Sequence, residues 1–119
     1  MSATDPAFLT FLERQQAEYR ASLPQRLADI ESLWRQVLHD GAPAAAALAT
    51  LERQAHSLAG SGATFGFAGL GDAARVLELA LNPLVGAAHA LTPAAQADVG
   101  RAIEALQRSL PGATGIQGV

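Results

Sequence analysis

Apolar residues recur at three- and four-residue intervals along most of the chain, which is the spacing of one face of an α-helix. β-branched and aromatic residues are sparse, so the pattern gives little support to strands. Residues that stop helices divide the pattern into four segments, at about Asp5–His39, about Pro43–Ala63, Phe67 or Ala68 into the eighties, and Thr92 to Pro111-Gly112. Four amphipathic helices with short connections predict an all-α fold, an antiparallel up-down four-helix bundle.

The ends of these segments carry recognisable signals. Thr4 or Asp5 can cap the first helix, and Thr92 followed by Pro93 suits the start of the last one. Pro24 lies inside the first segment and has no backbone N–H, so we expect the long first helix to be kinked or broken there. Residues 1–111 are predicted to form a single domain, and residues 112–119 a flexible tail.

The apolar stripes define the expected core, and we expect Trp34 and the phenylalanines to lie in the core or to pack between helices. The stripe residues are Phe8, Leu12, Tyr19, Leu23, Leu27, Ile30, Trp34, Val37 and Leu38, then Leu48, Leu51, Ala55 and Leu58, then Leu70, Ala74, Leu77, Leu81 and Leu84, then Val99, Ile103, Leu106 and Leu110.

Composition narrows the class of protein. Of 119 residues, 50% are hydrophobic and 16% charged, which fits one compact domain and argues against disorder. The net charge of −3 offers no general attraction to nucleic acid or to an anionic membrane. There is no cysteine, no signal-peptide pattern and no apolar run of membrane-spanning length. We therefore expect a cytoplasmic protein that binds neither nucleic acid nor membrane.

One histidine lies among unusually small residues, in the stretch AHSLAGSG that begins at Ala55. At 100° per residue, His56 falls roughly 120° from the centre of the stripe on its helix, which places it on the solvent side. Its neighbours on that face are Ala49, Glu52, Arg53, Ala59, Gly60 and Ala63. A glycine inside a helix weakens it by about 1 kcal/mol relative to alanine, so Gly60 favours a face that something approaches closely.

The stretch from Ala55 to Leu81 resembles the histidine phosphotransfer (HPt) domain of bacterial phosphorelays. The matching positions are His56, Leu58, Gly60, Ser61, Gly66, Leu70, Leu77 and Glu78. The resemblance implies that His56 receives a phosphoryl group from a phospho-aspartate on a receiver domain and can pass it to another receiver. It implies partners that are response-regulator receivers, with a hybrid histidine kinase among the candidates.

The same resemblance implies a carrier rather than an enzyme. A neutral imidazole nitrogen is a nucleophile near pH 7, and phosphoryl transfer depends mainly on positioning and charge stabilisation. The receiver would bring Mg²⁺, so we expect no cofactor or metal in this chain. Receivers would dock over Ala59, Gly60 and Ala63, and we expect a monomer.

Ala59 departs from the family pattern, which commonly has lysine three residues after the histidine. Arg53 lies one turn before His56 and is a candidate compensating cation. The departure keeps open a second hypothesis, an HPt-shaped module that sequesters a receiver or kinase without efficient transfer. A third is an unrelated four-helix structural or dimerisation protein.

The remaining candidates have structural interpretations. His39 and His89 suit helix ends, and the spacing of the three histidines lacks a zinc-site signature. Gly66 suits the turn between the second and third helices. Glu78 is either a solvated helix residue or a hydrogen-bond partner of the turn before its helix, and the sequence leaves both open. The carboxylates show no pair with acid–base spacing.

Overall fold

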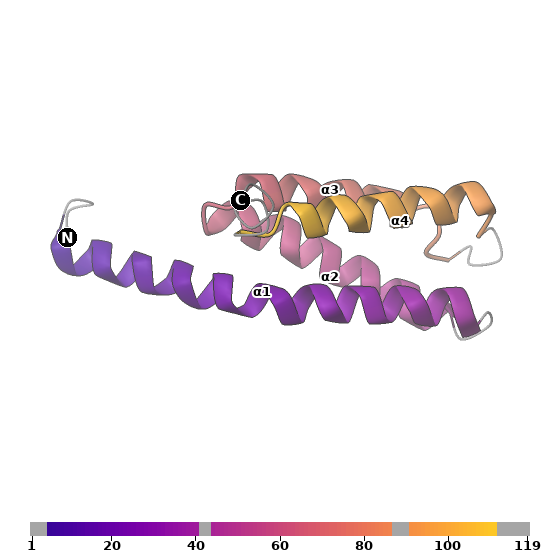
Figure 1. Cartoon of the computed structure of the whole chain (residues 1–119), viewed down its shortest axis with the longest axis horizontal. Helices are drawn as coiled ribbons and strands as arrows, with labels where there is room; N and C mark the ends of the chain where they lie inside the picture. Colours follow the sequence, from indigo (N-terminus) through magenta and orange to yellow (C-terminus); the bar gives the residue numbers. More distant parts are fainter. Residues whose placement is uncertain (1–4, 41–43, 87–90, 112–119) are drawn as a thin grey trace, which may run out of the picture.

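The chain folds as four helices in series, and the computed structural model describes residues 5–40, 44–86 and 91–111. The helices are α1 (Pro6–Asp40), α2 (Ala44–Thr64), α3 (Ala68–Leu81) and α4 (Pro93–Arg108). Each helix packs against the next in the chain, with α2 between α1 and α3 and with α4 against α3 (Figure 1). The described ranges contain no strand, so the predicted all-α up-down bundle is confirmed.

We expected α1 to be either kinked or broken at Pro24. The helix continues without interruption through Pro24, so it is not broken there. Figure 1 shows the axis of α1 changing direction near its middle, with the N-terminal part inclined toward the other helices. A bend is what a missing N–H and a clash with the preceding turn produce inside a helix. Asp5 starts α1, since its carboxylate accepts a hydrogen bond from the Ala7 N–H at 2.8 Å.

The N-terminal part of α1 extends beyond the other helices (Figure 1). α1 has 35 residues and α2 has 21, which correspond to about 52 and 32 Å of helix. Phe11 and Leu12 lie on this extension and are exposed, so the prediction that they pack in the core or between helices is wrong. Leu38, near the opposite end of α1, is also exposed, because it lies to one side of the buried stripe that ends with Val37.

The core is entirely apolar among the described residues. It comprises Tyr19, Leu23, Leu27, Ile30, Trp34, Val37, Leu48, Leu51, Ala55, Leu58, Ala59, Leu70, Ala74, Leu77, Leu81, Leu84, Val99, Ala102, Ile103 and Leu106. Phe65, Phe67 and Leu110 are partly buried against it. None of the helices in the described ranges is long and apolar enough to cross a membrane.

The turn between α2 and α3 is fixed by hydrogen bonds from both sides. Gly66 has a φ of +86°, a conformation that favours glycine, and this agrees with its expected role in the turn. The Phe67 N–H donates to the Gly62 carbonyl at 2.7 Å. From α1, the Gln16 side-chain amide donates to the Phe65 carbonyl at 2.9 Å. The turn is thereby tied to the bundle at the point where α1 begins to extend beyond it.

Two glycines bring the backbones of α2 and α3 into contact. A Cβ on Gly62 would lie 3.0 Å from the backbone nitrogen of Gly71, and a Cβ on Gly71 would lie 3.0 Å from the carbonyl oxygen of Ala59. Contacts this short leave no room for a side chain. The close approach fixes the register between the two helices, and with it the relation between His56 on α2 and Glu78 on α3.

Candidate functional site

His56 projects from the middle of α2 into solvent and is held by one residue of α3. Its side chain is 75% exposed, and its Nδ1 lies 2.7 Å from Oε2 of Glu78. The Glu78 side chain is only 15% exposed, so the carboxylate lies at the base of the ring rather than in open solvent. The ring is therefore accessible on its outer edge and anchored on its inner edge.

The contact with Glu78 determines the proton arrangement of the ring. A carboxylate oxygen accepts hydrogen bonds, so the contact assigns the proton of the neutral imidazole to Nδ1. The other nitrogen, Nε2, then carries an unprotonated lone pair. Oε1 of Glu78 is buried and has no hydrogen-bond partner among the residues that the structure describes. Among the hydrogen bonds of the described residues, the carboxylate is therefore committed to His56.

Glu78 matches the family pattern in the sequence, but sequence reasoning did not assign it to the site of His56. Neither of the two roles considered for it, solvated residue or partner of the preceding turn, describes its bond to His56. The signal available in the sequence was its place in α3, one residue after buried Leu77 and three before buried Leu81. A carboxylate so close to the apolar stripe of α3 lies near the neighbouring α2, where the His56 ring can form a hydrogen bond with it.

The surface beside His56 is nearly flat. Gly60 and Ala63 are exposed, as expected, and a Cβ on Gly60 would have no neighbour within 4 Å. Ala59 differs, because the sequence placed it on the exposed face whereas it is only 7% exposed. It lies at the edge of α2 that meets α3, where its carbonyl packs against Gly71. The open surface therefore runs along Gly60 and Ala63, and Ala59 belongs to the helix interface.

Arg53 is exposed on α2, but its guanidinium is directed away from His56. Its Nη2 donates to Oγ1 of Thr50 at 3.2 Å, toward the N-terminal end of the helix. It lines a groove between α1 and α2 together with Arg26. In this conformation the side chain contributes a cation near the histidine face without a contact to the ring.

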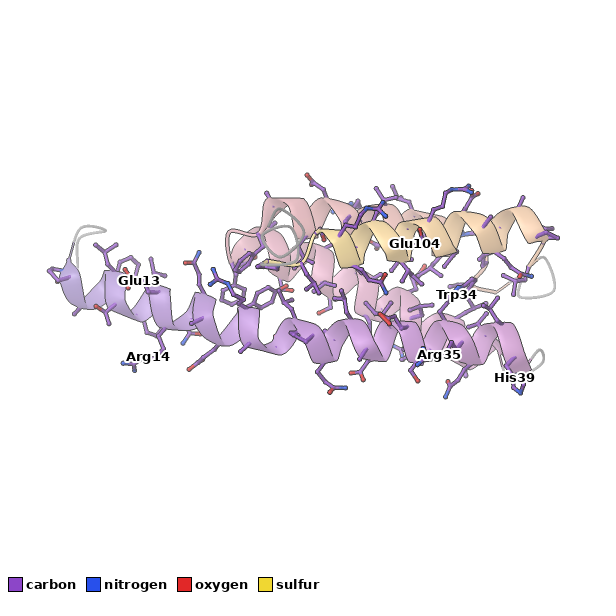
Figure 2. All side chains as sticks on the ribbon, in the orientation of Figure 1. Glu13, Arg14, Trp34, Arg35, His39 and Glu104 are labelled. Atoms are coloured by element: carbon purple, nitrogen blue, oxygen red, sulfur yellow. The ribbon has the colours of Figure 1, made fainter. Side chains whose placement is uncertain are left out.

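The other histidines lie apart from this site. His39 is in the last turn of α1, at the end opposite the N-terminal extension (Figure 2), and His89 lies outside the described residues. Within the described ranges, no three His, Asp or Glu side chains gather where they could hold a metal ion.

Comparison with known proteins agrees with this geometry. The family model of the Hpt domain matches residues 16–109, which include α2 and α3 with His56 and Glu78, all of α4 and most of α1. No curated protein and no solved structure matches the chain significantly. The match covers most of the chain, and the chain therefore belongs to the Hpt domain family, whose members are histidine-containing phosphotransfer modules of phosphorelays.

Proposed function

We propose that His56 is the phosphorylated residue of this domain, taking a phosphoryl group from the phospho-aspartate of one receiver and passing it to another. The observation that carries the proposal is the 2.7 Å contact between Nδ1 and Glu78 Oε2 beneath a ring that is 75% exposed. The contact assigns the proton to Nδ1 and leaves the lone pair of Nε2 for an incoming phosphorus.

The proposed transfer needs no chemical group other than those of the two proteins and the metal ion of the receiver. Nε2 attacks the phosphorus, the bond from phosphorus to the aspartate oxygen breaks, and the aspartate leaves as a carboxylate. The Nδ1 proton stays on the ring, which acquires positive charge, and the carboxylate of Glu78 stabilises that charge at 2.7 Å. In the reverse direction, the same charge makes the ring a good leaving group toward a second aspartate.

The catalytic parts of phosphoryl transfer would belong to the receiver, which is expected to bring Mg²⁺ and further positive charge. This chain would then be a carrier, with no cofactor of its own and no independent catalysis. The small residues Gly60 and Ala63 support close docking, and a carrier that changes partners needs moderate, transient contacts. We further propose a monomeric domain spanning residues 1–111 that acts in the cytoplasm.

The test is incubation with a receiver domain carrying a radiolabelled phospho-aspartate, in the presence of Mg²⁺. We expect an acid-labile, base-stable label on the wild-type chain and none on His56→Gln. His39→Gln is the matched control, since that histidine is exposed on another helix, and it should be labelled like wild type. A His56→Gln variant that still takes up label would overturn the assignment.

A second candidate is a module that binds a receiver or kinase without efficient transfer. It is favoured by Ala59, which leaves the position of the family's usual lysine without a cation and is buried at 7% exposure. The same experiment separates the two functions, because a stable complex with the phosphorylated receiver and no label on His56 would support sequestration.

A further inference from the structure

The groove between α1 and α2 has polar walls and an apolar floor. Its volume is about 380 Å³, within the range of roughly 300–1,000 Å³ that small-molecule sites occupy. Its floor is formed by Ile30 and Leu58, each 1% exposed. The polar residues that line it are Arg26 and Asp29 of α1 and Thr50, Arg53, Gln54 and Ser57 of α2. Two arginines against one aspartate give the lining a net positive charge, whereas the chain as a whole carries −3.

The groove opens on a different side of α2 from the His56 ring. At 100° per residue, Arg53 and Ser57 fall about 60° and 100° from His56 around the helix axis. Ala59, whose carbonyl packs against α3, falls on the other side of His56. The groove therefore adjoins the histidine face without including it.

None of the hydrogen bonds among the described residues joins the two walls of the groove. Asp29 accepts from the Gln25 amide at 2.9 Å within α1, and Arg53 donates to a hydroxyl of its own helix at 3.2 Å. Farther toward the C-terminal end of α2 the two helices are joined, since the hydroxyls of Tyr19 and Ser61 lie 2.7 Å apart. The polar groups of the two walls are thus available to a molecule that lies between them.

Arg26 is a half-buried cation held in one orientation. Its Nε donates to Ser22 Oγ at 3.2 Å, and its Cζ lies 5.4 Å from the centroid of the Tyr19 ring. Both contacts come from α1 and leave the two Nη groups without a hydrogen bond to the described residues. Neither Arg26 nor Arg53 forms an ion pair with a carboxylate in the described part of the chain. A guanidinium fixed in this way presents two donors to an oxyanion.

We propose that this groove binds a small phosphorylated molecule that carries hydroxyl groups, such as a sugar phosphate. Arg26 and Arg53 line opposite walls, and a phosphate presents oxygens to both walls at once, whereas one guanidinium already matches a planar carboxylate. The Ser57 hydroxyl and the Gln54 amide supply further donors. Asp29 is an acceptor in the same groove, and its partners on the ligand are the hydroxyl groups of the organic part.

The test is titration of the whole chain with ribose 5-phosphate, ribose and inorganic phosphate, followed by amide NMR at constant ionic strength. We expect ribose 5-phosphate to shift the amides of groove residues on both helices and ribose to shift none. Arg26→Gln and Arg53→Gln should each weaken binding about tenfold or more, since a hydrogen bond to a charged group contributes at least this factor. Arg14→Gln is the matched control and should bind like wild type, because Arg14 lies on the part of α1 that extends beyond the other helices (Figure 2).

Asp29 separates recognition of the hydroxyl groups from attraction of the phosphate. Asp29→Ala removes a negative charge from the groove, so inorganic phosphate should bind more tightly to this variant than to wild type. Ribose 5-phosphate loses an acceptor for its hydroxyl groups at the same time. The preference for ribose 5-phosphate over inorganic phosphate should therefore fall about fivefold. An unchanged preference would show that the groove does not recognise the organic part.

The proposal does not depend on the function proposed for His56. His56→Gln should bind ribose 5-phosphate like wild type, and loss of binding in that variant would place the phosphate on the histidine face instead of in the groove. The absence of shifts at the groove amides at tens of millimolar ribose 5-phosphate would refute the proposal. Equal binding by wild type and both groove-arginine variants would refute it as well.

Discussion

In the proposed transfer, the carboxylate of Glu78 decides which nitrogen of His56 receives the phosphoryl group. Without it, the ring is free to carry its proton on Nε2, where the lone pair is needed. The bond spans 2.7 Å between two helices whose backbones are in contact, so the orientation of the ring is set by the fold rather than by solvent. Glu78 is thus a positioning residue, and its removal should change the rate more than the binding.

We expect Glu78→Leu to lower the saturating rate of transfer to His56 by on the order of tenfold to a hundredfold, with KM for the receiver unchanged. Glu78→Gln should fall between this variant and wild type, because its amide oxygen still accepts from Nδ1 but carries no charge. Nitrogen NMR of the imidazole should report the shift of the proton away from Nδ1. Glu104→Leu, which removes an exposed glutamate from α4 (Figure 2), is the control and should match wild type.

Gly60 should show a conflict between stability and docking. Its φ is not positive and a Cβ would meet nothing within 4 Å, so Gly60→Ala should raise the free energy of unfolding by about 0.5–1 kcal/mol. The same methyl would project beside His56 and raise KM for the receiver roughly fivefold or more, since overpacking a contact costs about 1–3 kcal/mol. Thermal melts and receiver kinetics measure the two effects. A stabilised variant with wild-type KM would show that no partner packs against this position.

Arg53 tests whether a cation near the histidine face assists transfer. Within the described part of the chain, its guanidinium is hydrogen-bonded to the Thr50 hydroxyl alone. This is a contact of exposed groups that the guanidinium can leave when a phosphoryl group arrives. We expect Arg53→Ala to slow transfer about threefold to tenfold, with partial rescue by Arg53→Lys, since a single exposed charge contributes about 1 kcal/mol. Arg75→Ala on α3 is the control. Wild-type rates in Arg53→Ala would remove this residue from the site.

At the scale of the elements, the close packing of α2 against α3 contributes to the stability of the bundle and also sets the position of Glu78 relative to His56. We expect Gly71→Ala to lower the free energy of unfolding by about 1–3 kcal/mol, because its Cβ would lie 3.0 Å from the Ala59 carbonyl oxygen and force the helices apart. Gly69→Ala, in the same helix, meets nothing within 4 Å and should be neutral or stabilising. Urea denaturation of the two variants provides the comparison, and equal destabilisation would contradict the close packing.

The ends of the helices were predictable because they depend on local chemistry. Asp5 and Thr92 cap α1 and α4 through bonds to N–H groups two and three residues later, and the predicted ends of α1 and α2 lie within one residue of the observed ones. Contacts between helices are different, because they depend on register. The His56–Glu78 pair and the burial of Ala59 follow from how α2 sits against α3, which no local pattern contains.

The exposure of Phe11 and Leu12 near the N-terminal end of α1 could not be predicted from the sequence for a similar reason. Leu12 has the spacing of a core residue, and it is exposed only because α2 stops short of it. Periodicity identifies the apolar face of a helix, but the length of the neighbouring helix decides how much of that face is covered.

At the scale of the whole molecule, stability rests on the apolar core, and polar contacts between distant helices add less. Adjacent positions on α4 allow the two contributions to be compared. Leu106 is fully buried, whereas the side-chain amide of Gln107 donates to the Glu31 carboxylate on α1 in a partly buried contact. We expect Leu106→Ala to lower the free energy of unfolding by about 2–5 kcal/mol and Gln107→Ala by about 1–2 kcal/mol.

Urea denaturation with an unchanged m-value measures both losses. Labelling of His56 by phosphoramidate, a small donor that needs no docking, should equal wild type when each variant is measured under folding conditions, because neither residue is part of the hydrogen bond between His56 and Glu78. A larger loss from Gln107→Ala than from Leu106→Ala would mean that the link between the first and last helices, rather than the core, holds the bundle closed. In that case the double variant with Glu31→Ala should lose no more than Gln107→Ala alone, since both changes remove the same bond.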